Sequence, residues 1–554
     1  MTTIPTITIM HGMKTMSITI IPPAMKTEKK TEEKTEKKTE EKTKEKNKIT
    51  LEKLPGDTIG VICKYLGFKE RNILLGLSKA MWIEQKRYCY LNLNVKYSLK
   101  FYENEIFRDA INERVLYPHM QISLNLSNML VVDVSALGKV HTLNLSNTHV
   151  VDVSALGKVH TLNLSNTHVV DVSALGKVHT LNLCNTHVVD VSALAKVHTL
   201  NLSKTRVVDV SALAKVHTLN LSNCRSIRDT SVLGNVHTLD LSNTGIVDAS
   251  ALGNVHTLNL SNTHVVDANL LKNIHTLDLS STRVVDVSAL GNVHTLNLSN
   301  TDVVDASALG NVHTLDLSNT GVDDASALGK VHTLNLSNTD VLDVSALGKV
   351  HTLDLSKTYI DDVRALKNVH TLNLSYNCIE DISSLRHVHT LNLSNTDVDR
   401  YLDLSVLENV HTLNLSNTGV VDVSALENVH TLDLSNCRSL RDVSALGKVH
   451  TLTLGKCRYI DEKGIYRYLD LSTLGNVHTL DLTGCKHVNV SALGNVHTLN
   501  LQDSQYIDVS ALGNVNTLNL SHSFHPRGVW LLKNVPRLNL DWCKGIYEDT
   551  VWAR

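Results

Sequence analysis

Histidine, serine and aspartate recur throughout the 554-residue chain, and these side chains serve nucleophilic catalysis and metal binding. They return at a fixed interval, with Asp152 and His160 repeated as Asp171 and His179. A catalytic trio needs one arrangement that differs from all others, and periodic copies provide none. The sequence contains no His-Glu-x-x-His, no Gly-rich phosphate loop and no Cys-x-x-Cys pair. We therefore expect no catalytic residues, no cofactor and no resident metal, and the chain is predicted not to be an enzyme.

Histidine occupies one position in 19 consecutive repeats, from His141 and His160 to His478 and His497. If the repeats stack as neighbouring strands do, the imidazoles form a column with a spacing of roughly 5 Å. The column could bind metal ions, since imidazole is a common ligand, or it could be a polar residue copied by duplication. Because charging neighbouring imidazoles is unfavourable, both interpretations predict a stability that falls below about pH 6.

A short repeat positions these side chains. The phrase Val-His-Thr-Leu begins at residues 140, 159, 178, 197 and 216, and segments 140–158 and 159–177 are identical. A fixed period in this range indicates a solenoid, with about 22 turns over residues 121–554. The alternation around Asn144 predicts a short strand with its leucines inward. The apolar positions of one turn are Val140, Leu143, Leu145, Val150, Val153 and Leu156.

Nineteen residues leave no room for a long helix, so tight turns must return the chain to the next strand. Most turns carry an aspartate two places before a serine, as at Asp133, and its carboxylate can accept the serine backbone N–H. The ninth position is Thr in many turns, as at Thr148. An inward polar group there is expected to bond the backbone of the neighbouring turn and form a ladder. Other turns have cysteine at this position: Cys224, Cys437, Cys457, Cys485 and Cys543.

This pattern resembles the leucine-rich repeat, Leu-x-x-Leu-x-Leu-x-x-Asn/Thr/Cys-x-Leu, over 434 of the 554 residues. The resemblance implies an α/β fold, a leucine-rich-repeat solenoid of short parallel strands and tight turns. Strands about 4.8 Å apart give a stack on the order of 100 Å long. Cys437 and Cys457 fall in adjacent turns, and we expect reduced, buried thiols there rather than a disulfide, because no secretory signal is recognisable.

The twelfth position of the turn is expected to face water, because it accepts Asp323, Asp361 and Glu380. Valines at this position would form an exposed apolar stripe, which is either a contact surface or scattered surface valine. These valines are Val132, Val151, Val170, Val189, Val247, Val266, Val285 and Val304.

Side chains typical of binding hot spots gather in the irregular turns near the C-terminus. The insertion at 458–470 lies four turns inside the end, so it is not needed as a cap. We predict that it contacts a protein partner. The tryptophans Trp530, Trp542 and Trp552 are interpreted either as a cap over the open apolar end or as binding residues. The predicted partner-binding residues are Arg458, Tyr459, Tyr466, Arg467 and Tyr468.

Three segments precede the repeats. Residues 1–49 are predicted to be a disordered tail, because 27–48 are rich in Thr, Lys and Glu and contain nothing apolar. Residues 50–92 are predicted to be a small helical module. Residues 93–120 are expected to form an N-terminal cap or linker, with helix formers over 98–114. Tyr90 to Asn94 already has the pattern of a repeat strand.

The helical module has apolar residues at Ile59, Ile62, Tyr65 and Leu66, the spacing of an amphipathic helix. It resembles an F-box, whose pattern runs Leu-Pro-x-Glu/Asp, then Ile, Ile and Tyr-Leu, although Trp82 is displaced by one place from the family position. The alternative is a generic two-helix cap that shields the first repeat. The matching residues are Leu54, Pro55, Asp57, Ile59, Ile62, Tyr65, Leu66, Leu77, Ser78, Lys79 and Trp82.

An F-box implies docking to the small adaptor of cullin-type ubiquitin ligases. The residues that the resemblance assigns to adaptor binding are Leu54, Pro55, Ile59, Ile62, Tyr65, Leu66 and Leu77. A segment of about 40 residues cannot bury all of its apolar surface by itself. The apolar side chains left exposed at positions i, i+3 and i+4 of a helix could bind in a groove of the adaptor.

Composition limits the other partners. Lys+Arg 53 against Asp+Glu 55 gives a net charge of −2, which argues against a nucleic-acid partner held by general electrostatics. No stretch approaches 18 consecutive apolar residues, so no membrane span is expected. The chain resembles the F-box/leucine-rich-repeat proteins of large amoeba-infecting DNA viruses, which implies action on an unknown protein substrate in a host cell's cytoplasm. The alternative is a non-catalytic leucine-rich-repeat scaffold that binds host or self proteins without ubiquitin.

Overall fold

The computed structural model describes residues 6–11, 14–19, 90–114, 121–396, 403–457, 459–460, 466–467, 469–486 and 488–545. The chain forms two compact units, of which unit 1 ends at Thr186 and unit 2 begins at His187. Residues 54–82, with the F-box-like pattern and every predicted adaptor-binding side chain, lie outside the described residues.

Unit 1 contains an antiparallel pair of strands near its N-terminus, β1 (Thr6–His11) and β2 (Lys14–Thr19). Both strands fall within residues 1–49, the segment predicted to be a disordered tail. Apolar residues alternate with threonine there, as at Ile7 and Ile9, and period two is the pattern of a strand. The remainder of 1–49 lies outside the described residues.

Unit 1 also contains the first parallel strands, and each pairs with the next along the chain. They are β3 (Tyr90–Asn92), β4 (Gln121–Asn125), β5 (Thr142–Asn144), β6 (Thr161–Asn163) and β7 (Thr180–Asn182). Strand β3 is the repeat-like strand expected at Tyr90.

Two helices lie between β3 and β4: α5 (Val95–Glu103) and α6 (Glu105–Arg114). Asn94 caps α5 by accepting the N–H of Tyr97, and Phe101 on this helix is buried. Ser98 ties the helix to the sheet, because its hydroxyl donates to the carbonyl of Leu93 and accepts the N–H of Asn125.

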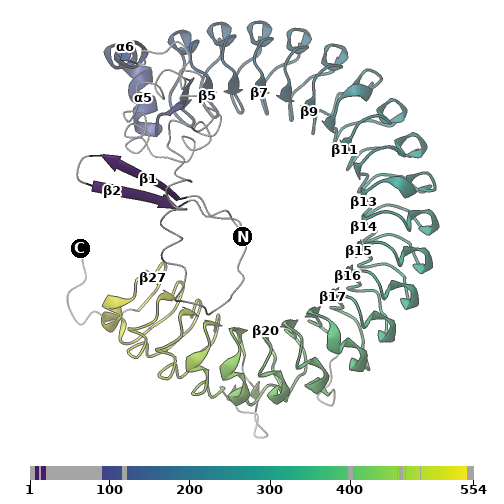
Figure 1. Cartoon of the computed structure of the whole chain (residues 1–554), viewed down its shortest axis with the longest axis vertical. Helices are drawn as coiled ribbons and strands as arrows, with labels where there is room; N and C mark the ends of the chain where they lie inside the picture. The colour runs from purple at the N-terminus through teal and green to yellow at the C-terminus, as the bar shows by residue number, and fades with distance from the viewer. Residues whose placement is uncertain are drawn as a thin grey trace, which may run out of the picture. The chain divides into compact units, whose positions relative to one another are not determined.

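Unit 2 continues the same design. Its parallel strands pair in register, residue for residue, so that Leu315 of β14 faces Leu334 of β15. In unit 2 the strands line the inner side of an arc and short 3₁₀ helices occupy the outer side (Figure 1). The strands are β8 (Thr199–Asn201), β9 (Thr218–Asn220), β10 (Thr238–Asp240), β11 (Thr257–Asn259), β12 (Thr276–Asp278), β13 (Thr295–Asn297), β14 (Thr314–Asp316), β15 (Thr333–Asn335), β16 (Thr352–Asp354), β17 (Thr371–Asn373), β18 (Thr390–Asn392), β19 (Thr412–Asn414), β20 (Thr431–Asp433), β21 (Thr451–Thr453), β24 (Thr479–Asp481), β25 (Thr498–Asn500), β26 (Thr517–Asn519) and β27 (Arg537–Asn539).

The return path of most turns is a single 3₁₀ helix, as the short period requires. In unit 1 these are η3 (Ser135–Leu137), η4 (Ser154–Leu156) and η5 (Ser173–Leu175). In unit 2 they are η6 (Ser192–Leu194), η7 (Ser211–Leu213), η8 (Leu233–Asn235), η9 (Ser250–Leu252), η10 (Asn269–Leu271), η11 (Leu290–Asn292), η12 (Ser307–Leu309), η13 (Ser326–Leu328), η14 (Ser345–Leu347), η15 (Arg364–Leu366), η16 (Ser383–His387), η17 (Leu404–Leu407), η18 (Ser424–Leu426), η19 (Ser444–Lys448), η20 (Leu474–Asn476) and η21 (Val529–Asn534). Among the helices of the described residues, none has the length and apolar character needed to cross a membrane.

The core is built from the apolar positions that the repeat predicts. Val140, Leu143, Leu145, Val150, Val153 and Leu156 are all buried, which confirms the expected inward set. The predicted turn is also confirmed, because Oδ1 of Asp133 accepts the N–H of Ser135 at 2.9 Å. The eighth position adopts a left-handed conformation, as at Asn147 with φ of 57°, and asparagine tolerates this region better than most residues.

The threonines at the ninth position do not form the expected hydrogen bonds to the neighbouring turn, as Thr148 shows. The hydroxyl of Thr148 donates to the carbonyl of Leu145 in its own turn, at 2.6 Å, rather than to the neighbouring turn. Cysteine does bridge turns, because Sγ of Cys437 contacts the carbonyl of Leu415 at 3.2 Å. A short branched hydroxyl reaches the carbonyl three residues back, which satisfies it locally.

Candidate interaction surfaces

The histidine column, defined by the second-position histidines of each unit, is formed as the spacing predicts. In unit 1 the ring centroids of His141 and His160 are 4.6 Å apart, and those of His160 and His179 are 4.7 Å apart. In unit 2 the column runs from His198 to His497, with centroid separations of 4.5–4.8 Å and interplanar angles of 8–13°.

Parallel stacking determines what these imidazoles can do chemically. The nitrogen lone pairs of a ring lie in its plane, so neighbouring parallel rings direct them side by side and not at a common point. One nitrogen is also engaged, because Nδ1 of His313 lies 3.2 Å from the hydroxyl of Thr314. Within the described ranges, no group of three or more His, Cys, Asp or Glu side chains is arranged to hold a metal ion.

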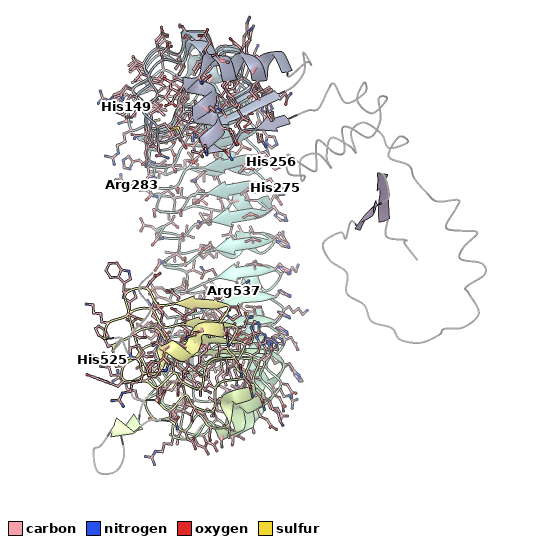
Figure 2. The ribbon with its side chains drawn as sticks, turned by 90° about the vertical axis from the view of Figure 1, so that its left-hand side faces the viewer. His149, His256, His275, Arg283, His525 and Arg537 are labelled. Carbon is pink, nitrogen blue, oxygen red and sulfur yellow. The ribbon has the colours of Figure 1, made fainter. Side chains whose placement is uncertain are left out.

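The column lies along one edge of the sheet. In unit 2, His256 and His275 are on the opposite side of the ribbon from Arg283, which belongs to the turn after the strand (Figure 2). Burial and the neighbouring imidazoles lower the pKa of His294, and the same two causes lower the pKa of His351. These two rings therefore favour their neutral form.

These shifts set the sign of the pH dependence. The pKa values of His294 and His351 lie below the ordinary value of 6.5, so the folded chain binds fewer protons at these residues than the unfolded chain. Their contribution to stability is complete above about pH 6.5 and is lost as the pH falls through that value toward the lower folded-state pKa. We expect the Tm to fall between about pH 7.5 and pH 5, measured by circular dichroism.

A matched variant isolates the column from other acid effects. Asparagine occupies the column position naturally at Asn516, whose N–H donates to the carbonyl of His497 at 3.1 Å. The triple variant His294→Asn/His351→Asn/His389→Asn, which replaces histidines whose pKa is lowered, should therefore fold and lose less Tm on acidification than the wild type. A wild-type Tm that is equal at the two pH values would contradict the account.

The twelfth-position valines are exposed, as predicted. In unit 1 Val132, Val151 and Val170 expose 55–60 % of their surface, and in unit 2 Val247, Val266, Val285 and Val304 expose 53–60 %. We call this row the valine stripe. Asp323, Asp361 and Glu380 are exposed at the same position of later turns.

A row of aspartates follows the valine stripe at the next residue. Each aspartate that fixes a turn accepts the backbone N–H of the residue two places later, as Asp343 accepts that of Ser345. This hydrogen bond lowers the pKa of Asp343. The Arg364 guanidinium lowers the pKa of Asp362 to about 2. These carboxylates are therefore charged at neutral pH, and the outer side of the turns combines apolar side chains with negative charge.

The insertion predicted to contact a partner contains a small antiparallel pair, β22 (Tyr459–Ile460) and β23 (Tyr466–Arg467). The structure thus brings the backbones of Tyr459, Tyr466 and Arg467 together. The predicted residues Arg458 and Tyr468 lie outside the described residues.

Both ends of this insertion are anchored in the core of unit 2. Cys457, just before it, is buried, and so are Leu469 near its end and Leu471 just after it. The antiparallel pair therefore extends from a fixed base.

The cap interpretation of the C-terminal tryptophans is not supported for the two that the structure describes. Trp530 is 46 % exposed and Trp542 is 75 % exposed, so neither covers the apolar end by burial. Trp542 stacks on His522 with centroids 6.3 Å apart, and Tyr506 stacks on His525 at 5.4 Å. Exposed, stacked aromatic side chains of this kind are typical of binding surfaces. Trp552 lies outside the described residues.

The ladder cysteines are structural. Cys437 and Cys457 are both free thiols, as expected. Burial raises the pKa of Cys485 to about 11 and raises the pKa of Cys457 still further. Such thiols are not poised as nucleophiles, because the thiolate is the reactive form.

Comparisons with known proteins identify the fold. No model of a protein family matches the chain, and no curated protein matches it. The solved structure of a TLR13–ssRNA13 complex is similar, with a TM-score of 0.51 and 20 % identity over 76 % of this chain and 79 % of that chain. This likeness and the parallel sheet of short, regular strands show a leucine-rich-repeat solenoid, the fold predicted from the repeat.

Two further solved structures are similar at lower TM-scores. The functional domain of InlJ from Listeria monocytogenes, which includes a cysteine ladder, gives a TM-score of 0.41 and 20 % identity over 60 % of this chain and 74 % of that chain. The leucine-rich-repeat ectodomain of the receptor kinase GASSHO1/SCHENGEN3 from Arabidopsis thaliana gives 0.40 and 14 % identity over 82 % of this chain and 70 % of that chain.

Proposed function

We propose that the chain is a substrate-recognition subunit of a cullin-type ubiquitin ligase, acting in the cytoplasm, and in a host cytoplasm if the chain is viral. Residues 50–92 bind the F-box-binding adaptor, and the solenoid holds a protein substrate for ubiquitin transfer. The chain itself performs no chemistry in this proposal. The transfer belongs to the ligase that the adaptor recruits.

The observation that carries the proposal is the F-box-like pattern directly before the first strand of the solenoid. The pattern ends near Trp82, and β3 begins at Tyr90. A docking module joined by so short a connection to a long repeat array can hold an adaptor and a substrate on one polypeptide. The array supplies an extended surface of the kind with which solenoids commonly bind proteins.

The substrate surface is proposed to lie in the irregular turns of unit 2. The insertion with β22 and β23 stands on a buried base, and Tyr506 and Trp542 expose stacked aromatic rings. The regular strands instead present threonine and asparagine or aspartate outward, which are weak anchors for a protein partner. This contrast supports partner binding by the irregular turns.

Adaptor capture tests the proposal. Full-length chain is incubated with purified adaptor, and the bound fraction is measured by co-purification and by biolayer interferometry. The variant Leu54→Ala/Pro55→Ala/Leu66→Ala should reduce affinity at least about tenfold, because the anchors of an amphipathic docking helix dominate its binding energy.

The matched control is Glu52→Ala/Lys53→Ala/Lys64→Ala, which alters the same segment at positions outside the F-box pattern. It should retain adaptor binding. If the wild-type chain binds no adaptor, the ubiquitin-ligase role is wrong, and the alternative is a non-catalytic leucine-rich-repeat scaffold.

A further inference from the structure

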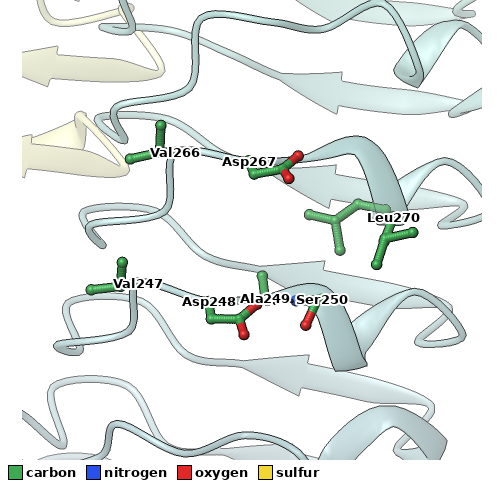
Figure 3. Close-up of a pocket in the computed structure, with 8 residues that line it drawn as sticks. Val247, Asp248, Ala249, Ser250, Val266, Asp267 and Leu270 are labelled. Atoms are coloured by element: carbon green, nitrogen blue, oxygen red, sulfur yellow. Dashed lines mark hydrogen bonds between the residues drawn. The ribbon is translucent and has the colours of Figure 1, made fainter.

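A hollow opens on the outer side of unit 2 where two consecutive turns depart from the repeat. Regular turns read Val-Asp-Val-Ser-Ala-Leu, but alanine stands in place of the second valine in both turns, at Ala249 and Ala268. In the second of these turns Leu270 also stands where neighbouring turns have alanine. The resulting cavity, the Leu270 hollow, has a volume of about 250 Å³. Its lining includes Val247, Asp248, Ala249, Val266, Asp267 and Leu270 (Figure 3).

The walls of the hollow are apolar side chains left in contact with water. Val247 exposes 60 %, Val266 53 % and Leu270 57 % of their surface. Neighbouring turns pack with alanine at the position of Leu270, so the larger leucine side chain is not required for packing of the turn. The valine stripe continues from the hollow through Val285 and Val304, so the apolar surface extends over further turns.

Two carboxylates stand beside these walls. Asp248 accepts the N–H of Ser250 at 2.8 Å, and Asp267 accepts the N–H of Asn269 at 2.8 Å. The bond from the Ser250 backbone lowers the pKa of Asp248, so this group is charged at neutral pH. The lining residues include no cation, so the negative charge of the hollow is not compensated within it.

We propose that the Leu270 hollow binds a peptide segment of a partner protein in which an apolar side chain is flanked by Lys or Arg. The apolar side chain enters against Val247, Val266 and Leu270, and the cation pairs with Asp248 or Asp267. The proposal rests on the proposed interaction function of the solenoid but not on adaptor binding. It assigns a specific recognition element to the otherwise regular turns.

The repeat itself supplies variants that remove the hollow without risk to the fold. Ala249→Val/Leu270→Ala gives these two positions the residues of the regular phrase, and valine is already buried at the equivalent position of a nearby turn, at Val287. Asp248→Asn/Asp267→Asn removes the charge but keeps the turn, because Asn489 accepts the N–H of Ser491 at 3.0 Å in the same way.

The probe is a displayed library of random 12-residue peptides, selected on the full-length chain. Enriched peptides should carry Lys or Arg within two residues of an apolar side chain. Their affinity, measured by fluorescence anisotropy, should fall at least tenfold in each double variant, while the Tm of the regular-phrase variant stays that of the wild type. Binding should also weaken with added salt.

Three results would overturn the proposal: no enriched peptide, enriched peptides without a cation, or an affinity for the double variants equal to that for the wild type. These failures are distinguishable from failure of the ligase role, because adaptor capture depends on residues 50–92 and not on the hollow. A chain that captures adaptor but selects no peptide would overturn the hollow alone.

Discussion

Replacing Leu334 with alanine is expected to lower the free energy of unfolding by about 2–5 kcal/mol. Leu334 is 1 % exposed and lies in β15, in register with Leu315 of β14 and Leu353 of β16. Truncation removes contacts with both neighbouring turns and leaves a cavity that the stacked backbone cannot close. Urea unfolding followed by circular dichroism measures the change.

Thr333→Ala is the matched control, because Thr333 precedes Leu334 in the strand and points outward, only partly buried. It should change stability little. Since each turn contacts only its neighbours, faster hydrogen exchange in Leu334→Ala should be concentrated within about residues 312–370. A Leu334→Ala variant as stable as Thr333→Ala would show that the inward leucines do not form the core.

Replacing Asn377 with leucine is expected to lower stability by about 3 kcal/mol, despite the gain in apolar volume. Asn377 is 1 % exposed and occupies the ninth position, where most turns have threonine. Its amide nitrogen donates to the carbonyls of Leu355 and Leu374 at 2.7 and 3.0 Å. Its oxygen accepts the N–H of Thr358 at 3.1 Å.

Leucine at this position would leave the Leu374 carbonyl and the Thr358 N–H without partners, at a cost of about 1–3 kcal/mol for each. Asn377→Thr is the control, because a threonine hydroxyl bonds the carbonyl of its own turn, as Thr358 bonds Leu355 at 2.6 Å. The expected order of Tm is wild type, then Asn377→Thr, then Asn377→Leu. A leucine variant with the wild-type Tm would refute the bridging role of the amide.

The repeat made most of the fold predictable. Once one turn is assigned, its inward set repeats, so the burial of Val140 and Leu143 implies the burial of their equivalents in every regular turn. The spacing of the histidine column followed from stacking in register, and the aspartate–serine turn followed from the local sequence, because its hydrogen bond joins residues two places apart. The F-box-like pattern lies outside the described residues and stays a prediction.

The departures from the repeat were harder to predict. Thr148 bonds within its own turn because side-chain length, not polarity, decides which carbonyl is reached. The exposure of Trp542 depends on how the last turns end, which the pattern does not specify. The Leu270 hollow could have been found from sequence by asking which positions break the phrase, since both Ala249 and Leu270 do so.

The account depends on one claim, that successive turns stack in register so that equivalent residues form columns. Cysteine pairs test it directly. Thr314 and Thr333 are partners in β14 and β15, and neighbouring strands lie about 4.8 Å apart, within the range that a disulfide spans. Thr314 and Thr352 are two strands apart, about 9.6 Å, which a disulfide cannot span.

We expect Thr314→Cys/Thr333→Cys to form a disulfide on mild oxidation, identified by mass spectrometry of the tryptic digest, while Thr314→Cys/Thr352→Cys does not. Equal cross-linking of the two pairs, or none in the first, would contradict stacking in register and with it the histidine column, the valine stripe and the Leu270 hollow.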